Sequence, residues 1–171
     1  MPPELHLDPS CLDLTQVLAD QEAIRQVNPQ RFEMEQLTAI VHVDEKQHII
    51  AGYKDVQGDE FWVRGHMPGH PLLPGVLMCE AAAQLCSYYI VKHSDLLQGG
   101  IVGFGGLENA RFRSPVRPGD RLVLIGKGTR LNRRQPIFNV QGFVGRTMVF
   151  HADVIGVNLV LPGLTAGTEE E

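Results

Sequence analysis

The sequence predicts an α+β domain in which one buried helix lies against an antiparallel sheet. One long apolar stretch, residues 76–91, has a composition that favours helix, whereas several other runs are rich in β-branched residues. Short segments containing glycine or proline separate these runs, and no alternation of strands with helices indicates parallel βαβ units. A length of 171 residues is usual for one domain, so we expect residues 1–171 to form one.

The N-terminal half predicts short elements. Its first residues, 1–12, contain several prolines and show no periodicity, which indicates an irregular arm. Apolar positions between Leu14 and Val27 predict a short amphipathic helix, ended by Asn28-Pro29 because a residue before proline avoids the helical region. Strands are then predicted at 38–43, 48–56 and 60–64, followed by a structured loop at 65–75 that is dominated by glycine, proline and histidine.

The C-terminal half predicts the long helix and most of the sheet. Thirteen of the sixteen residues at 76–91 are apolar, and a helix that is apolar nearly all round must be buried within its own protein. The remaining strands, which bring the sheet to about six or seven, are predicted at 101–113, 121–130, 137–144 and 147–160. Residues 164–171, with the sequence TAGTEEE at 165–171, are predicted to be disordered.

Composition excludes several classes of protein. No run approaches the ~18 apolar residues of a membrane span, and the first ten residues lack the basic start and apolar core of a secretory signal. Three cysteines are an odd number without metal-ligand spacing, so we expect Cys79 and Cys86 to pack as small hydrophobes, with no metal. These features favour a reducing cytoplasm and no integral membrane contact.

Charge is distributed unevenly along the chain. The net charge of −5 argues against a nucleic-acid partner, but residues 111–134 alone carry +7, which leaves −12 for the rest. A basic region inside an acidic protein indicates either an acidic or phosphate-bearing partner, or simply solvated strand faces and turns. Its basic residues are Arg111, Arg113, Arg117, Arg121, Lys127, Arg130, Arg133 and Arg134.

The polar residues of the apolar helix are candidates for chemistry. Glu80, Gln84 and Ser87 are spaced i, i+4, i+7 and therefore fall on one narrow stripe. A buried carboxylate needs either a partner or a role, since uncompensated burial is costly. Glu80 is therefore either an acid whose pKa burial would raise, or a structural group bonded to backbone or an arginine.

The preceding loop supplies the other candidates. Histidine exchanges protons near neutral pH, and both His66 and His70 lie in a segment framed by glycine and proline. Pro74-Gly75 then opens the helix, where backbone N–H groups lack partners and the helix dipole is positive. A base, an acid and a donor for a developing oxyanion would thus lie within fifteen residues, although isolated loop histidines are usually only polar surface residues.

Two longer motifs make the sequence recognisable. Residues 65–85, GHMPGHPLLPGVLMCEAAAQL, resemble the signature of FabZ-type (3R)-hydroxyacyl-[acyl-carrier-protein] dehydratases of the hotdog superfamily. Residues 110–120, ARFRSPVRPGD, resemble a second block of the same family, in the right order. The resemblance implies a hotdog fold, in which a long central helix is wrapped by an antiparallel sheet, and a hydro-lyase activity in fatty-acid elongation.

The resemblance also implies roles for individual residues. His66 would take the α-proton of a 3-hydroxyacyl thioester, Glu80 would help the hydroxyl leave as water, and the Gly75 N–H would bind the thioester carbonyl. Gln84 would hold Glu80 or nearby backbone in place. Pro74, Val76 and Met67 would contact substrate, and Arg111, Arg117 and Arg121 would suit the acidic carrier protein.

Partners follow from the same resemblance. It implies a homodimer in which His66 of one subunit meets Glu80 of the other, and it allows a trimer of dimers, that is, a homohexamer. The reaction would need no cofactor beyond the phosphopantetheine arm of acyl carrier protein. The length of the acyl chain, the pathway, and whether the thioester is carried on carrier protein or on coenzyme A stay open.

The sequence departs from the family pattern in two places. Met67 replaces a usual phenylalanine, and residues 28–35 replace a segment resembling Leu-Pro-His-Arg-Tyr-Pro-Phe, with Gln30 in place of its histidine. Glu33 and Glu35 would be unusual in the wall of an acyl channel. These departures keep two alternatives open, a dehydratase of a specialised lipid or polyketide pathway and a non-catalytic paralogue that binds acyl thioesters. Isomerising relatives typically carry aspartate at position 80, and thioesterases of this fold generally lack the His-Pro-Gly block.

Overall fold

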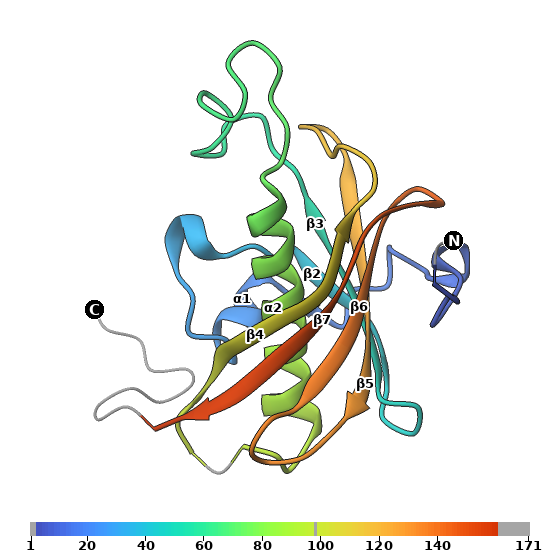
Figure 1. The fold of residues 1–171 in the computed structure, drawn as a ribbon, viewed down its shortest axis with the longest axis vertical. Helices are drawn as coiled ribbons and strands as arrows, with labels where there is room; N and C mark the ends of the chain where they lie inside the picture. The colour runs from blue at the N-terminus through green and yellow to red at the C-terminus, as the bar shows by residue number, and fades with distance from the viewer. Residues whose placement is uncertain (1–2, 98, 161–171) are drawn as a thin grey trace.

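A long helix lies in the hollow of a strongly curved antiparallel sheet (Figure 1). The computed structural model describes residues 3–97 and 99–160. The strands are β1 Ala19–Asp20, β2 Ala39–Asp44, β3 Ile49–Asp55, β4 Ile101–Phe112, β5 Arg121–Arg130, β6 Ile137–Val144 and β7 Thr147–Leu159. The helices are α1 Gln21–Arg25 and α2 Gly75–His93, with single 3₁₀ turns at Pro9–Cys11 and Phe32–Met34.

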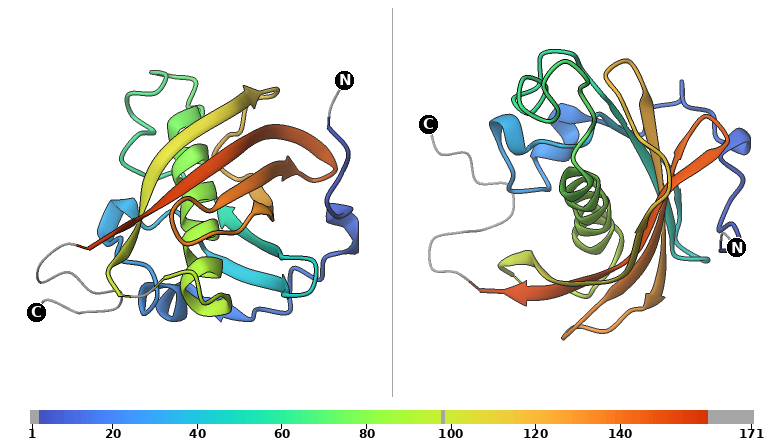
Figure 2. Two further views of the ribbon diagram at one scale, coloured as in Figure 1. Left: turned by 60° about the horizontal axis from the view of Figure 1, so that its bottom comes forward. Right: turned by 45° about the horizontal axis from the view of Figure 1, so that its top comes forward.

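The sheet has seven strands in the order β1-β2-β3-β5-β6-β7-β4, and every neighbouring pair is antiparallel. Figure 2 shows the sheet curling around α2. The predicted architecture, a central helix wrapped by an antiparallel sheet, is therefore confirmed. β4, which follows α2 in the chain, lies at the open edge beside β7.

The core fills the space between α2 and the inner face of the sheet. Leu85, at the centre of α2, is fully buried in one cluster with residues such as Ile50, Leu124 and Phe150 from the strands. Burial of apolar side chains on nearly every face of α2 explains why its sequence shows so little amphipathic pattern. Among the described residues, no helix combines the length and apolar character needed to cross a bilayer.

The prediction of a helix over 14–27 is wrong for most of that range. Only Gln21–Arg25 is helical, because the Asp20 carboxylate accepts a hydrogen bond from Ala23 N–H and so begins the helix there. Before it, the chain pairs with β2, and Leu18 N–H donates to the Ile40 carbonyl. The partner strand therefore overrides the helical spacing of the apolar residues.

The prediction of a strand over 60–64 is also wrong, since these residues form consecutive turns. Gly65 and His66 N–H both donate to the Trp62 carbonyl, a local pattern that cannot extend into a ladder. The cause lies in the side chains. Glu60 forms a 2.8 Å ion pair with the buried Lys54 and accepts a hydrogen bond from the buried Trp62 indole, so these two side chains hold the start of the segment against the core.

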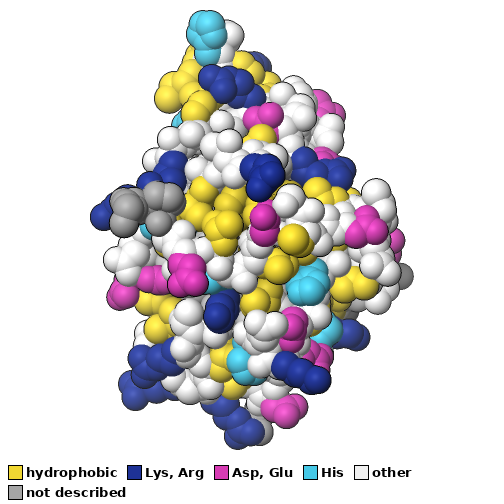
Figure 3. Space-filling view, turned by 90° about the vertical axis from the view of Figure 1, so that its right-hand side faces the viewer, with side chains coloured by type: hydrophobic (Ala, Val, Ile, Leu, Met, Phe, Trp, Pro, Cys, Tyr) yellow, Lys and Arg dark blue, Asp and Glu magenta, His cyan; other side chains and the backbone are white. Residues whose placement is uncertain are grey.

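A second apolar cluster lies on the outer face of the sheet, covered by the N-terminal arm (Figure 2). Leu7, Leu12 and Leu14 pack there, against β2, β3, β5 and β6. Figure 3 views the molecule from the side on which the arm lies in Figure 1, and acidic, basic and hydrophobic side chains are interspersed there. The predicted tail at 164–171 lies outside the described residues, and the single-domain organisation of residues 1–171 stays a prediction.

The arm should bind the sheet less strongly in acid. His6 Nε2 lies 2.7 Å from Asn139 Oδ1, and burial lowers the pKa of His6 below its ordinary value of 6.5. A histidine whose pKa is lower in the folded state disfavours folding once the unfolded chain protonates. We therefore expect stability to be lost as the pH falls below 6.5, more in the wild type than in His6→Gln. Thermal unfolding across this pH range checks it, and parallel curves would contradict it.

Candidate active site

The loop that carries His66 is fixed by backbone hydrogen bonds, both within the loop and to a neighbouring segment. Leu72 N–H donates to the His66 carbonyl, and Leu73 N–H anchors the end of the loop to the Val116 carbonyl. The His66 ring is partly buried, and its Nδ1 lies 2.8 Å from the Leu72 carbonyl oxygen. Because a carbonyl can only accept, Nδ1 carries the proton and Nε2 is left with a free lone pair. This is the tautomer that a general base requires.

The start of α2 shares a pocket with His66. Gly75 and Val76, the first residues of the helix, line this pocket together with Phe112 from the end of β4. The Gly75 N–H has no backbone acceptor among the described residues, as expected in the first turn of a helix. The pocket thus holds a free imidazole nitrogen and an unpaired backbone donor, which can stabilise a developing oxyanion.

Glycine at position 75 has a packing reason that the sequence did not reveal. A Cβ there would lie 2.8 Å from the Phe112 ring, which covers the start of the helix and stacks on Phe150. The other predicted contacts differ from one another. Pro74 is buried immediately before the helix, Val76 is 74% exposed and Met67 is 51% exposed. Val76 is therefore open to a ligand or a second protein chain.

Glu80 lies one turn further along α2, half-buried and held by a neighbour. Its Oε1 accepts a 2.8 Å hydrogen bond from Gln84 Nε2. Gln84 is itself fixed, because its Nε2 also donates to the Met34 carbonyl and its Oε1 accepts from Gln36 N–H. The polar stripe of the helix is thus tied to residues 34–36, and Gln84 orients the carboxylate.

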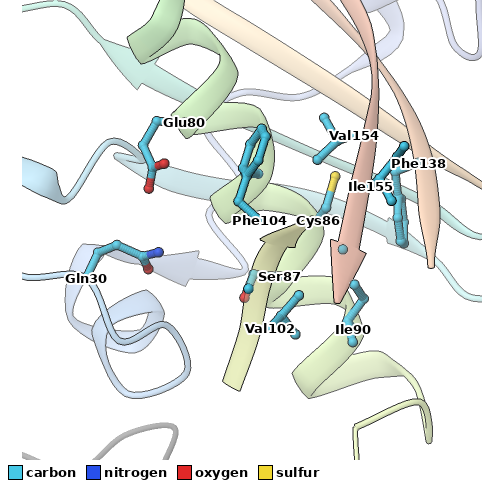
Figure 4. Close-up of a pocket in the computed structure, with 13 residues that line it drawn as sticks. Gln30, Glu80, Cys86, Ser87, Ile90, Val102, Phe104, Phe138, Val154 and Ile155 are labelled. Carbon is cyan, nitrogen blue, oxygen red and sulfur yellow. The ribbon is translucent and has the colours of Figure 1, made fainter. Parts of the chain in front are cut away.

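Within one chain, the two candidate catalytic groups line different pockets. Glu80 lines a pocket formed by α2, β4, β6, β7 and Gln30, whereas His66 lines the pocket at the start of α2 (Figure 4 shows the Glu80 pocket). The two pockets have no lining residue in common. The sequence brings these groups close along the chain, but the single chain does not place them in one cavity.

Segment 28–35 turns its carboxylates away from the Glu80 pocket. Glu35 forms a bidentate ion pair with Arg25, at 2.6 and 3.0 Å, and Glu33 is exposed. Gln30 is the residue of this segment that reaches the pocket. Neither Glu33 nor Glu35 lines the Glu80 pocket, and Arg25 neutralises the charge of Glu35.

The basic region separates into two groups. β5 spans about 30 Å between Arg121 and Arg130, so the basic residues of 111–121 lie far from those of 130–134. Arg121 forms two hydrogen bonds with Asp55, at 2.6 and 2.8 Å, and its guanidinium lies 3.9 Å from the centre of the Tyr53 ring. These contacts give Arg121 a structural role.

The arginines near His66 are exposed. Arg113 lines the His66 pocket, Arg117 lines the adjoining hollow beside His70, and Arg111 is exposed at the end of β4. Burial lowers the pKa of His151 on the neighbouring strand β7. The positive charges of Arg113 and Arg111 lower it further. Neither Arg113 nor Phe112 could be assigned to this pocket from the sequence, since only the fold brings the end of β4 to the start of α2.

Two buried thiols lie on α2, and one of them lines the Glu80 pocket. Cys86 lines the same pocket as Glu80 and is 3% exposed. Burial raises the pKa of its thiol. Cys79 is also buried with a raised pKa, so both pack as neutral, apolar groups as predicted. No cluster of three potential metal ligands is found among residues 3–97 and 99–160.

Solved structures with the same architecture support the class of fold. The dehydratase heterocomplex ApeI:P from Xenorhabdus doucetiae has a TM-score of 0.68 at 13% identity, covering 80% of this chain and 91% of its own. Cj0977, a sigma28-regulated virulence protein of Campylobacter jejuni, has a TM-score of 0.61 at 17% identity, with coverages of 82% and 90%. At such identities the likeness concerns the fold alone, and that fold is the hotdog.

Sequence relatives define the family more narrowly. A sequence model described as the FabA-like domain matches residues 28–153, and the chain belongs to this family. The 3-hydroxyacyl-[acyl-carrier-protein] dehydratase FabZ of Thermus thermophilus is 39% identical over 108 residues, which cover 63% of this chain and 75% of that protein. The FabZ of Desulfotalea psychrophila is 33% identical over 128 residues, with coverages of 74% and 85%.

A longer relative carries the same region beside other sequence. The bifunctional enzyme LpxC/FabZ of Chlorobaculum tepidum is 34% identical over 141 residues, which cover 81% of this chain. The chain spans only 30% of the length of that enzyme. The relatives therefore share a FabZ-type region with this chain, and the predicted resemblance to FabZ-type dehydratases is confirmed.

Proposed function

We propose that the protein is a hydro-lyase that dehydrates (3R)-hydroxyacyl-[acyl-carrier-protein] thioesters to trans-2-enoyl thioesters in fatty-acid elongation. The observation that carries the proposal is the hydrogen bond between His66 Nδ1 and the Leu72 carbonyl, which leaves Nε2 free as a base. His66 lies in one pocket with the Gly75 N–H, in a chain whose relatives bear the name of this activity.

The proposed reaction is an elimination. His66 Nε2 takes a proton from the α-carbon, and the charge that develops on the thioester carbonyl is stabilised by the Gly75 N–H at the positive end of α2. The bond between C3 and the hydroxyl breaks, and Glu80 gives the departing oxygen a proton, so that water leaves as the double bond forms. These proton transfers need no cofactor besides the pantetheine arm that carries the acyl chain.

A homodimer would complete the site. β4 is a twelve-residue edge strand, and on its outer side no other strand of the described residues pairs with it. Its unpaired backbone groups there suit pairing with the same strand of a second copy. The exposed Phe104, Phe112 and Val76 lie on or near this edge. A second copy would cover them and supply His66 to the pocket of Glu80. Three such dimers could assemble further into a hexamer.

We propose that acyl carrier protein docks beside His66. The side chains of Arg117 and Arg113 are exposed there and form no ion pair with a carboxylate among the described residues, so their charge is available to an acidic partner. The three cysteines are unpaired, and a reducing cytoplasm is the location that we propose.

Charge reversal tests this docking site. We expect Arg117→Glu to raise KM for carrier-protein thioesters about tenfold and to leave kcat unchanged, because a rim charge acts mainly on association. Arg117→Glu should turn over a short, uncharged pantetheine thioester at the same rate as the wild type. Arg134→Glu, at the far end of β5, is the matched control and should change neither constant. Equal KM values for the two variants would contradict the docking site.

The steady-state test of the proposed function is hydration of a trans-2-enoyl thioester, followed by loss of its conjugated absorbance. This reverse reaction shares its transition state with dehydration. We expect the wild-type protein to hydrate trans-2-enoyl thioesters of carrier protein. Absence of turnover at every chain length, with carrier protein and with coenzyme A, would favour a non-catalytic paralogue that binds acyl thioesters.

A further inference from the structure

The pocket beneath Glu80 has a polar side that a saturated acyl chain would leave without partners. Its walls are mostly apolar, and Ile90, Phe138 and Ile155 are among them. Along one side, however, lie Glu80, Ser87 and Gln30 (Figure 4). Gln30 comes from the segment before the first long strand, whereas Glu80 and Ser87 project from α2.

The amide of Gln30 is unpaired. Its Oε1 is buried and has no hydrogen-bond donor, and its side chain makes no hydrogen bond to the described residues. A buried amide oxygen that lacks a donor is costly, so a water or a ligand must satisfy it. Since amide oxygen and nitrogen exchange positions by a simple flip, Gln30 can offer either a donor or an acceptor to the pocket.

Ser87 adds a second unpaired group. The residue is 5% exposed and lines the pocket, and its hydroxyl makes no hydrogen bond to the described residues. A helical serine commonly bonds to the carbonyl four residues earlier, as Ser94 does here with Ile90 at 2.6 Å. Ser87 does not do so, and its hydroxyl remains available to an occupant of the pocket.

The backbone that carries Gln30 is held in place. Arg31 Nη1 donates to the carbonyls of Asn28 and Gln30, at 2.9 and 2.8 Å, and Asn28 Nδ2 donates to the Gln84 carbonyl on α2. The segment is thus fixed to the helix that carries Glu80. Gln30 therefore occupies a defined position in the pocket.

We propose that Gln30 and Ser87 form a subsite for a second hydroxyl on the acyl chain, so that the preferred substrates are 3-hydroxyacyl thioesters hydroxylated further along the chain. This inference rests on the proposed function. Ser87 follows Glu80 by seven residues, which places the subsite about 10 Å along the helix from the acid. No lysine or arginine lines the pocket, which disfavours a chain that ends in a carboxylate, whereas a hydroxyl can both donate to and accept from these two groups.

The test compares pairs of 3-hydroxyacyl thioesters of equal length, one ending in a methyl group and the other in a hydroxyl group. For the wild type, we expect kcat/KM to favour the hydroxylated chain about three- to tenfold at the length that reaches the subsite. In Gln30→Met, of similar size but without hydrogen bonds, the preference should turn toward the methyl-terminated chain. Ser87→Ala should reduce the preference, and Gln26→Met, at an exposed site, should keep the wild-type ratio.

Thermal unfolding separates this role from a structural one. Because Gln30→Met removes a buried amide oxygen that has no donor, we expect the melting temperature to be unchanged or raised. A marked fall would assign Gln30 to folding or assembly instead. A wild-type preference for the methyl-terminated chain at every length, or the same ratio in Gln30→Met, would overturn the subsite. If no thioester of either kind is dehydrated, the proposed function itself fails, and the subsite with it.

Discussion

Replacing His66 with alanine lowers kcat/KM for dehydration by about 10²- to 10⁴-fold, the usual contribution of a general base. The expectation follows from the geometry of the ring. The Leu72 carbonyl takes the Nδ1 proton and fixes the plane of the imidazole, so that Nε2 is the only nitrogen free to accept a proton. Initial rates of enoyl hydration and of dehydration, measured with the same carrier thioester, check this prediction.

His70→Ala is the matched control for this variant. His70 lies four residues further along the same loop and is exposed, with its backbone in the turn between Met67 and itself. We expect it to retain a rate close to that of the wild type. A large loss in His70→Ala together with near-normal turnover in His66→Ala would assign the base to the other histidine.

The sequence predicted the parts of the fold whose burial is decided by composition. α2 was predicted within two residues at each end, because an apolar stretch of that length can only be a buried helix. β5 and β6 were predicted with their observed boundaries, since Pro118-Gly119 precedes β5, Pro136 precedes β6 and Gly145 follows it. In these elements local and tertiary preferences agree.

The predictions of secondary structure that were wrong lie where a single tertiary contact determines the conformation of the chain. Residues 60–64 have β-forming composition, but the ion pair between Glu60 and the buried Lys54 folds them into turns. Leu14 to Leu18 have helical spacing, yet the chain pairs with β2 instead. Neither partner is adjacent in sequence, so local patterns could not reveal these contacts.

The candidate site divides in the same way. His66, Gly75, Glu80 and Gln84 could be proposed from the sequence, because their residue types and spacing carry the chemistry. The roles of Gln30 and Phe112 depend on which distant elements meet α2, and no pattern along the chain encodes that. The separation of His66 and Glu80 into two pockets of one chain is likewise visible only in three dimensions.

Glu80→Gln should lower kcat/KM by about 10²- to 10⁴-fold, as expected for the loss of a general acid. Glutamine keeps an oxygen that can accept from Gln84 Nε2, so the fold and the hydrogen bond at 2.8 Å should survive. What it cannot do is give a proton to the departing hydroxyl. Circular dichroism and thermal unfolding like those of the wild type would show that the loss is chemical.

Mixing two inactive variants then tests whether the site is shared between subunits. When His66→Ala and Glu80→Gln chains are refolded together in equal amounts, about half of the dimers contain one of each. If His66 of one subunit acts with Glu80 of the other, each mixed dimer has one intact site and one doubly impaired site, so about a quarter of the wild-type rate should return.

The matched control replaces Glu80→Gln with the double variant His66→Ala/Glu80→Gln. No dimer in that mixture has a His66 imidazole, so no rate should return. If the first mixture forms mixed dimers, as seen by native mass spectrometry, and still stays inactive, both groups must act from the same chain. In that case the His66 pocket and the Glu80 pocket would have to close into one cavity on substrate binding, because the single chain holds them apart.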